Sequence, residues 1–359
     1  MSARPIMIIA GGTGGHVFPA LAVAAMLREQ SVPVVWLGTA HGLEARVVPA
    51  AGIALETLSV RGLRGNGWLG WLKAPLTLLR ALGQAFAIIR RTNPTAVLGM
   101  GGYVTGPGAV AARLSGRALV IHEQNAIAGL TNRLVAKIAQ RVLTGLDAPL
   151  GRADRREWIG NPIRAEIAAL PQPASRYEGR TGPARVLVIG GSLGARTLNQ
   201  VVPAALAKLP DDSRPRVWHQ AGERTLETAK AAYENAGVKA DITAFIADMA
   251  QAYAWCDLVI CRAGALTVSE LAAAGVPAIF VPLPHAVDDH QTKNAAFLTQ
   301  AGAARLMPEH TLTAATLAHT LNELLAERGE LLAMAKAARA QGRPNAAERV
   351  AAVCLEVAA

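Results

Sequence analysis

The sequence predicts an α/β fold of two Rossmann-like, doubly wound parallel-sheet domains that face one cleft. The first observation is residues 6–19, IMIIAGGTGGHVFP, an apolar run that breaks into four glycines within five residues and reopens as a helix. The second is residues 186–197, VLVIGGSLGART, which repeats the order of strand, glycine turn and helix. Each begins its own alternation of strand and helix patterns, which is typical of parallel sheets with helices on both faces.

The first glycine turn, residues 11–15, has the composition of an anion-binding loop. Glycine lets the backbone approach a ligand closely, and the following helix N-terminus offers unpaired N–H groups and a positive dipole end. His16 closes the turn, and an imidazole can exchange a proton near neutral pH. A dinucleotide site would need GxGxxG and an acidic residue about 20 positions later. Glu29 and Glu44 fall on either side of that distance, so a dehydrogenase is disfavoured.

The composition is that of a globular protein with enough apolar residues for two cores. The chain has 359 residues, of which 52% are hydrophobic and 17% charged. Cys256, Cys261 and Cys354 form no CxxC pair, which predicts free thiols in a reducing compartment. No run of about 18 residues is apolar enough to span a bilayer, and the first apolar run is too short for a signal peptide.

The net charge of +10 is concentrated in the first half of the chain. Residues 1–160 contain 17 Lys and Arg against 7 Asp and Glu, whereas residues 161–359 contain 19 of each kind. A phosphorylated substrate, anionic lipid headgroups or nucleic acid would suit this excess. Nucleic acid ranks lowest, because only 4% of the chain is aromatic and no nucleic-acid-binding motif occurs.

The segment between the two glycine turns predicts further α/β units. Residues 17–30 are expected to form a helix, and residues 34–38 and 53–58 two strands. A helix is also expected over residues 74–91, because Pro75 suits a first helical turn and apolar residues recur on one stripe. That stripe, which we expect to face the core, consists of Leu76, Leu79, Leu82, Phe86 and Ile89.

An apolar and basic segment precedes this helix. Its apolar side chains are Trp68, Leu69, Trp71 and Leu72, and its flanking cations are Arg61, Arg64 and Lys73. Exposed aromatic and apolar side chains ringed by cations suit a membrane interface. Alternatively, this glycine-punctuated loop folds back onto its own helix, and the sequence favours neither arrangement.

Two more strand ends in the first half carry glycines or polar side chains. The expected strand at residues 96–100 opens into GGYVTGPG, and the strand at residues 118–121 runs into HEQNAIAG, where Asn125 is expected to cap the next helix. Open α/β sheets bind ligands at the carboxyl ends of their strands. Burying His122 and Glu123 without a purpose would be costly, which favours a functional site. Alternatively, Glu123 pairs with a nearby arginine.

The motifs extend along nearly the whole chain: GGTGGHVFP, GGY, HEQN, GNPIR, GGSLGAR, CRAGALTVSE and HAVDDHQTKNA. Together they resemble the MurG family of peptidoglycan glycosyltransferases. The resemblance implies the GT-B architecture and inverting transfer of N-acetylglucosamine from UDP-N-acetylglucosamine to undecaprenyl-diphospho-muramoylpentapeptide, which converts lipid I to lipid II. It further implies a peripheral protein on the cytoplasmic side of the cell inner membrane, with a role in cell wall biogenesis, cell shape, cell division and the cell cycle.

The resemblance places the UDP-sugar donor mainly on the second domain. There the N–H groups of Ala265, Leu266 and Thr267 are expected to hold the diphosphate, and Glu270 the ribose hydroxyls. The other expected donor contacts are Arg164 and Ser192 to the nucleotide, Phe245 and Ile246 to the uracil, Gln291 and Asn294 to the sugar, and Thr13, Gly14, Gly15 and Asn125 in the first domain. The family often has two successive glutamines where this chain has His290 and Gln291, which leaves a role for His290 open.

The resemblance places the lipid acceptor on the first domain. The expected acceptor contacts are Gly12, His16, Gly102, Tyr103, Glu123 and Asn125, and the expected membrane contacts are Trp68, Trp71 and Leu72. Both His16 and Glu123 are candidates for the catalytic base. The chain has no DxD pair, so we expect no metal ion and no cofactor. A helix dipole and backbone amides would then stabilise the departing UDP.

The domain boundary is expected near residues 160–164. An acceptor domain over residues 1–162 would be followed by a donor domain over residues 163–340, which opens with a proline-rich linker around residues 170–183. Residues 341–359 would form a last helix that returns to the first domain. Two alternatives use the same fold and nucleotide: a UDP-sugar 2-epimerase, and a nucleotide-sugar sensor without enzymatic activity.

Overall fold

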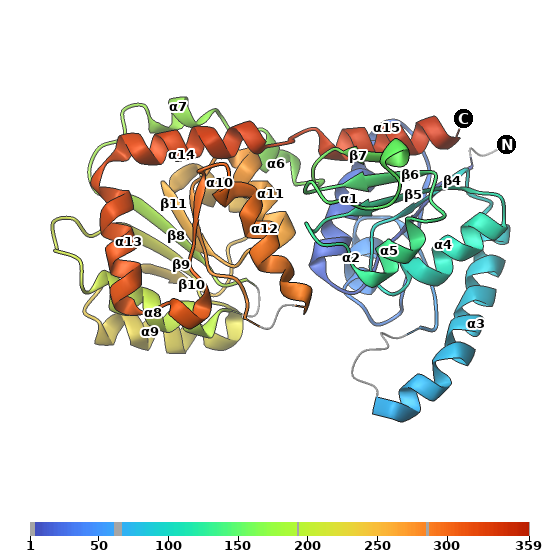
Figure 1. The fold of residues 1–359 in the computed structure, drawn as a ribbon, viewed down its shortest axis with the longest axis horizontal. Helices are drawn as coiled ribbons and strands as arrows, with labels where there is room; N and C mark the ends of the chain where they lie inside the picture. The colour runs from blue at the N-terminus through green and yellow to red at the C-terminus, as the bar shows by residue number, and fades with distance from the viewer. Residues whose placement is uncertain (1–3, 61–66, 192–193, 285–286, 359) are drawn as a thin grey trace. The chain divides into compact units, whose positions relative to one another are not determined.

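The computed structural model describes residues 4–60, 67–191, 194–284 and 287–358, with the backbone alone for residues 67–74 and 287. Contacts divide the chain into two compact units (Figure 1). Unit 1 comprises Met1–Arg164 and Pro344–Ala359, and unit 2 comprises Ala165–Arg343. Each unit is built on one parallel sheet with helices on its faces, so the predicted α/β class with two doubly wound domains is confirmed.

The described part of unit 1 forms a seven-stranded parallel sheet in the order β3-β2-β1-β4-β5-β6-β7. Its strands are β1 (Ile6–Ile9), β2 (Val34–Gly38), β3 (Ala54–Thr57), β4 (Ala96–Gly99), β5 (Ala118–Glu123), β6 (Arg141–Thr144) and β7 (Arg156–Trp158). Its helices are α1 (Gly14–Glu29), α2 (Glu44–Ala50), α3 (Gly67–Thr92), α4 (Thr105–Leu114), α5 (Leu130–Val135) and α15 (Ala346–Ala358).

The interior strand β1 is buried on both faces, which explains its unbroken apolar run. Met7 and Ile9 belong to the core cluster that also contains residues of α3, α4 and α5. Ile6 and Ile8 point into the opposite cluster, together with residues of α1 and α15. The last helix α15 packs against α1 and so belongs to unit 1 (Figure 1). Parallel strands covered on both faces show continuous apolar runs rather than alternation.

The described part of unit 2 forms a six-stranded parallel sheet in the order β10-β9-β8-β11-β12-β13. Its strands are β8 (Arg185–Ile189), β9 (Arg216–Gln220), β10 (Asp241–Thr243), β11 (Leu258–Cys261), β12 (Ala278–Phe280) and β13 (Ala304–Leu306). Its helices are α6 (Ala165–Ala168), α7 (Pro173–Tyr177), α8 (Arg196–Leu206), α9 (Leu226–Asn235), α10 (Met249–Trp255), α11 (Ala265–Ala274), α12 (His290–Thr299), α13 (Ala314–Ala326) and α14 (Arg328–Gln341).

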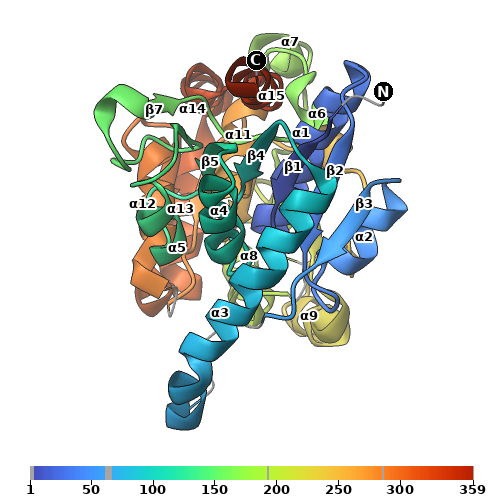
Figure 2. The same ribbon diagram turned by 90° about the vertical axis from the view of Figure 1, so that its right-hand side faces the viewer.

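Helix α3 differs from the prediction at its N-terminal end. It begins at Gly67 and includes Pro75, so the segment expected to form a loop around Trp68, Trp71 and Leu72 is helical, although their side chains lie outside the described part. The predicted apolar stripe is also buried along only part of its length. Ile89 is fully buried and Leu82 and Phe86 pack on the core, as predicted, but Leu76 and Leu79 are 73% and 66% exposed. The reason is visible in Figure 2, where the N-terminal half of α3 extends beyond the rest of unit 1.

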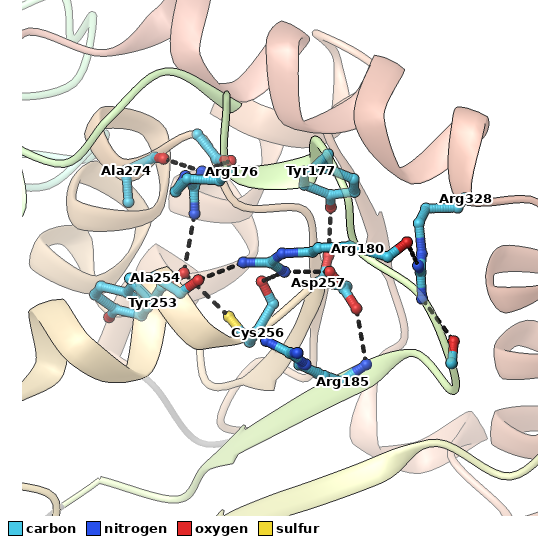
Figure 3. Close-up of polar contacts among 12 residues, drawn as sticks. Arg176, Tyr177, Arg180, Arg185, Tyr253, Ala254, Cys256, Asp257, Ala274 and Arg328 are labelled. Carbon is cyan, nitrogen blue, oxygen red and sulfur yellow. Dashed lines mark hydrogen bonds and ion pairs between the residues drawn. The ribbon is translucent and has the colours of Figure 1, made fainter. Parts of the chain in front are cut away.

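The segment expected to be a linker, residues 170–183, is bound to unit 2 (Figure 3). Tyr177 donates its hydroxyl hydrogen to Asp257 O at 3.0 Å, and Arg180 forms an ion pair with the Asp257 carboxylate. Arg328 donates hydrogen bonds to Arg180 O and, at 2.9 Å, to Gly182 O. Hydrogen bonds from arginine side chains to backbone carbonyl groups leave no periodic pattern in the sequence, so the packing of this segment on unit 2 could not be predicted.

The three cysteines are buried and free, as predicted. Burial raises the pKa of Cys256 and of Cys354 to about 12, so both remain thiols at neutral pH. Among the described residues, no helix is both long and apolar enough to cross a bilayer.

Candidate active site

A buried carboxylate lies beneath the first glycine turn. Glu44 is fully buried, and its Oε2 accepts a hydrogen bond from Gly12 N at 3.1 Å. Its Oε1 accepts from Thr39 N at 3.0 Å and from Thr39 Oγ1 at 2.6 Å. A Cβ atom on Gly11 or Gly42 would lie 2.7 or 2.2 Å from its oxygens, so a side chain at either position would displace the carboxylate. The negative group that this turn holds is the chain's own carboxylate, and Gly12 N–H is not free for the predicted acceptor contact.

Helix α1 starts three residues earlier than predicted, so His16 lies in its first turn. Thr13 is the N-cap residue, and the first intrahelical hydrogen bond runs from His16 N to Thr13 O at 3.1 Å. The N–H groups of Gly14 and Gly15 therefore have no partner within the helix. This first turn, which the structure describes completely, contains no acidic residue. The predicted ligand contacts at Thr13, Gly14 and Gly15 remain predictions, and this open helix end is compatible with them.

The imidazole of His16 is held by two other loops of unit 1. Its Nδ1 lies 3.1 Å from Gln124 Oε1, in the loop after β5. A Cβ atom on Gly101, after β4, would lie 2.6 Å from the same Nδ1, so only glycine leaves room for the ring. Gly102 packs equally closely, because its Cβ would lie 2.3 Å from Gly11 O. The carboxyl ends of β1, β4 and β5 thus meet at His16, with the half-buried Tyr103 beside them.

Glu123 organises the loop that follows β5. Its side chain is 2% exposed, and its two oxygens accept hydrogen bonds from Asn125 N, Asn125 Nδ2, Gly129 N and Asn132 Nδ2 at 2.9–3.1 Å. These partners are amides, not the arginine of the alternative interpretation. The expectation that Asn125 caps the next helix is wrong, because Gly129 is the N-cap of α5 and Asn125 folds onto Glu123 instead.

His122 precedes Glu123 and is completely buried. Its Nε2 donates a hydrogen bond to Gly160 O at 2.9 Å. Burial lowers the pKa of His122 to about 4, because the charged imidazolium would be desolvated. His122 is therefore neutral at neutral pH and supports the loop rather than exchanging protons there.

In unit 2, the corresponding site is the N-terminus of α11. Its N-cap is Gly264, and its first intrahelical hydrogen bond runs from Val268 N to Gly264 O at 2.9 Å. The N–H groups of Ala265, Leu266 and Thr267 therefore have no partner within the helix, as a diphosphate site requires. The fully described first turn contains no acidic residue. The helix begins one residue before the predicted Leu266.

Two side chains of α12 brace the loop ahead of α11. Gln291 Oε1 accepts hydrogen bonds from Ala263 N at 3.2 Å and from Leu283 N at 2.9 Å. Asn294 Nδ2 donates to Ala263 O at 3.1 Å. Asn294 has no exposed surface, so its predicted contact with the sugar would need this loop to move. Gln291 is half-buried, and its contact with the sugar stays a prediction.

Glu270 lies on α11, and its Oε2 accepts a hydrogen bond from Tyr253 Oη at 3.1 Å. Tyr253, on α10, is 1% exposed, so it holds the carboxylate from the protein side.

The two predicted uracil contacts follow β10. Phe245 is 60% exposed, so its ring is accessible for stacking. Ile246 is buried and donates its N–H to Gln220 Oε1 at 3.1 Å.

Arginines cap the opposite end of α11. Arg176 donates hydrogen bonds to Ala274 O at 2.5 Å and to Gly275 O at 2.7 Å, as Figure 3 shows for Ala274, and also to Tyr253 O at 2.9 Å. Arg339 donates to Ala273 O. Cations at a helix C-terminus stabilise its unpaired carbonyl groups and its negative dipole end. The helix is thus stabilised at one end and open to an anion at the other.

Ser192 and Arg164, the two predicted nucleotide contacts, remain predictions. Ser192 lies outside the described residues. Arg164 is exposed at the last position of unit 1, directly before unit 2.

Three residues of these sites were not predicted from the sequence. Gln124 was part of the HEQN motif, but nothing in its spacing distinguished it from its neighbours. The sequence position of Glu44 indicates only an acid at the wrong distance for a dinucleotide site. Tyr253 lies in a helix of ordinary composition, with no signal that it reaches Glu270.

Comparisons with known proteins agree along the whole chain. Residues 6–144 match the N-terminal domain of glycosyltransferase family 28, and residues 185–350 match its C-terminal domain. The UDP-N-acetylglucosamine--N-acetylmuramyl-(pentapeptide) pyrophosphoryl-undecaprenol N-acetylglucosamine transferase of Alkalilimnicola ehrlichii is 62% identical, over 99% of both chains. The protein of the same name from Marinobacter nauticus is 54% identical, over 99% of this chain and 98% of its own.

Solved structures give the same result. The crystal structure of Acinetobacter baumannii MurG superposes with a TM-score of 0.86 at 40% identity, over 98% of this chain and 99% of its own. The UDP-GlcNAc 2-epimerase of Neisseria meningitidis reaches a TM-score of 0.67 over 98% of this chain and 99% of its own, but at 12% identity. The second likeness therefore concerns the fold alone.

Proposed function

The chain belongs to the MurG family within glycosyltransferase family 28, and we propose that it transfers N-acetylglucosamine from UDP-N-acetylglucosamine to undecaprenyl-diphospho-muramoylpentapeptide. The product would be lipid II of peptidoglycan synthesis. The observation that carries this proposal is the 62% identity to a transferase of that name over 99% of both chains. A GT-B fold alone would not distinguish a transferase from an epimerase.

We assign the donor to unit 2. The open N-terminus of α11 offers the N–H groups of Ala265, Leu266 and Thr267 to the diphosphate. Glu270, held by Tyr253, can accept hydrogen bonds from the two ribose hydroxyls. As the bond between the anomeric carbon and UDP breaks, negative charge grows on the diphosphate. The helix dipole and these N–H groups stabilise that charge without reorganising.

We assign proton transfer to His16. The acceptor hydroxyl attacks the anomeric carbon from the face opposite UDP, its oxygen forms the new bond, and its proton passes to the imidazole. Glu123 is the weaker candidate for the base, because its two oxygens already accept four hydrogen bonds within its own loop. His16 is half-buried, so its ring is less enclosed than that carboxylate.

Transfer of labelled sugar tests the proposal directly. Incubation with labelled UDP-N-acetylglucosamine and the undecaprenyl-linked acceptor should move the label into the lipid fraction and release UDP. In the absence of acceptor, the donor should stay unchanged. Conversion of the donor alone to an isomer would identify an epimerase instead. Tight UDP binding without turnover on any acceptor would identify a sensor.

We further propose that unit 1 docks on the cytoplasmic face of an anionic membrane through α3, α4 and α5. These helices lie side by side (Figure 2), and exposed apolar side chains occur on each of them. They are Leu76, Leu78, Leu79, Val110, Leu114, Leu130 and Leu134. Exposed Arg80, Arg113, Arg133 and Lys137 accompany them. Apolar insertion together with cations on anionic lipid is typical of peripheral membrane proteins.

Exposed leucines on α3 provide the test of docking. The double variant Leu76→Ser, Leu79→Ser should lose sedimentation with anionic vesicles and keep its melting temperature, because both side chains are solvent-exposed. Leu283→Ser, which changes an exposed leucine of unit 2, is the matched control. Unchanged vesicle binding of the double variant would contradict the docking surface.

A further inference from the structure

The side chain of Gln124 is buried between a backbone carbonyl and the ring of His16. Gln124 is 1% exposed and directly follows β5. Its Nε2 donates a hydrogen bond to Met100 O at 2.9 Å, and its Oε1 lies 3.1 Å from His16 Nδ1. A carbonyl oxygen can only accept, so Met100 decides which end of the amide points to it. A flipped amide would place two acceptor oxygens against each other.

This orientation determines the protonation of His16. Gln124 Oε1 can only accept, so the hydrogen of this contact must be carried by His16 Nδ1. In a neutral imidazole, a proton on Nδ1 leaves the lone pair on Nε2. The ring lies in the space that Gly101 leaves by having no side chain, because a Cβ atom there would lie 2.6 Å from Nδ1 and 2.8 Å from Cε1.

We propose that Gln124 is a positioning residue that holds His16 in the Nδ1–H tautomer and so makes Nε2 the atom that receives the proton. The tautomer follows from the contacts above, whereas its catalytic use rests on the proposed function of His16. In the transfer step the hydroxyl proton passes to Nε2, the hydroxyl oxygen bonds to the anomeric carbon, and the electron pair of the broken C–O bond leaves with UDP. Afterwards Nδ1–H still donates to Gln124, so that contact need not change.

The amide of Gln124 suits this position better than a carboxylate would. A carboxylate at this position would also accept from Nδ1, but it would meet Met100 O without a donor and would place a negative charge beside the ring. The neighbouring ionisable groups on the same strand end are already engaged. His122 is neutral because burial lowers its pKa to about 4, and the Glu123 carboxylate is held by the amides of its own loop. Gln124 thus orients the ring without adding charge.

Nitrogen NMR tests the tautomer without any assay of turnover. In protein labelled with ¹⁵N at histidine, the His16 signals are assigned by their loss in His16→Asn. At a pH where His16 is neutral, we expect a protonated Nδ1 and an unprotonated Nε2 in the wild type, and a mixture of tautomers in Gln124→Met. A wild-type His16 protonated on Nε2 would overturn the inference.

Kinetics test the use of this tautomer. Gln124→Met should lower kcat roughly 10- to 100-fold, since orientation supplies part of what a general base contributes, and should leave the Kd of UDP unchanged. Gln124→Glu restores an acceptor for Nδ1 and should move the acid limb of the pH–rate profile upward by about one unit, because a carboxylate stabilises the imidazolium. A merely structural role of Gln124 would not move that limb.

Gln140→Met is the matched control, because it removes a glutamine that accepts from Leu119 N at 3.0 Å in the same sheet. It should keep the wild-type kcat. Wild-type kcat in Gln124→Met would overturn the positioning role. A fully active His16→Ala would overturn the proposed base and with it the catalytic part of this inference, and the NMR result would show separately whether the tautomer assignment stands.

Discussion

The glycine turn before α1 in unit 1 and the loop before α11 in unit 2 share one local pattern but differ in the side chains around them. Both place a helix N-terminus directly after a buried parallel strand. In unit 1 the loop ahead of the N-cap holds a carboxylate, because Gly12 N–H donates to the buried Glu44, whereas the N–H groups of Gly14 and Gly15 have no partner within α1. In unit 2 the first turn of α11, which lies wholly within the described residues, contains no acidic residue, and Arg176 and Arg339 cap the other end of the helix.

This difference is compatible with the division of the reaction that we propose for the two units. An internal carboxylate braces the unit 1 turn and fixes the backbone that carries His16, which suits a site that must position one proton acceptor. An open helix N-terminus with a capped C-terminus suits a site that must bind a diphosphate. A glycine-rich turn after a strand is therefore not by itself evidence for a phosphate ligand. Whether such a turn can bind a phosphate depends on the side chain that lies beneath it.

The largest effect should come from His16→Ala. We expect kcat to fall roughly 10²- to 10⁴-fold, the usual contribution of a general base, with the Kd of UDP nearly unchanged. Steady-state kinetics with saturating donor would measure the first quantity and calorimetry the second. Near-normal turnover would contradict the role proposed for unit 1, because unit 1 would then contribute no proton acceptor at this position.

Next in size should be Glu44→Gln. The new amide would face Gly12 N–H with a donor instead of an acceptor, and leaving a buried donor unpaired costs about 1–3 kcal/mol of unfolding free energy. Denaturant unfolding would measure this loss, with Glu29→Gln, at the exposed end of α1, as the control. Turnover should also fall, whereas UDP binding should not. Unchanged stability would contradict the role of Glu44 as a brace.

The smallest effect should come from Tyr253→Phe. It removes the hydroxyl that donates to Glu270 Oε2. Because a single hydrogen bond makes a net contribution of about 0.5–1.5 kcal/mol, the Kd of UDP should rise by at most about tenfold. The value of kcat should stay close to that of the wild type. A loss of kcat with unchanged UDP affinity would place Glu270 in the chemistry rather than in the donor site.

The fold and the helix N-termini on which we place the candidate sites could be predicted from the sequence because they rest on local patterns. The apolar runs of β1 and β8, their glycine turns and the helix after CRAG are contiguous in the chain, and the expected starts of α1 and α11 differ from the observed ones by three residues or fewer. The prediction that Leu76 and Leu79 face the core is wrong, because periodicity identifies an apolar stripe but not where the core that covers it ends.

The contacts that give these sites their chemistry could not be predicted in the same way. The hydrogen bonds from Gly12 to Glu44 and from Tyr253 to Glu270 span 32 and 17 residues, and that between His16 and Gln124 spans 108. Side chains that meet only after the sheet forms leave no period or spacing in the sequence. For the same reason, the sequence could name Glu123 as a candidate base but could not reveal that its oxygens are already occupied.

The division between the two units is tested most directly by UDP calorimetry and kcat measured on His16→Ala, Glu270→Ala and the double variant. We expect Glu270→Ala to weaken UDP binding by about 1.5–3 kcal/mol, the contribution of hydrogen bonds to a charged group. The double variant should have the UDP affinity of Glu270→Ala and, at saturating donor, the kcat of His16→Ala, because the effects of independent sites add. Loss of UDP binding in His16→Ala, or a Glu270→Ala variant that loses kcat but not affinity, would contradict the division.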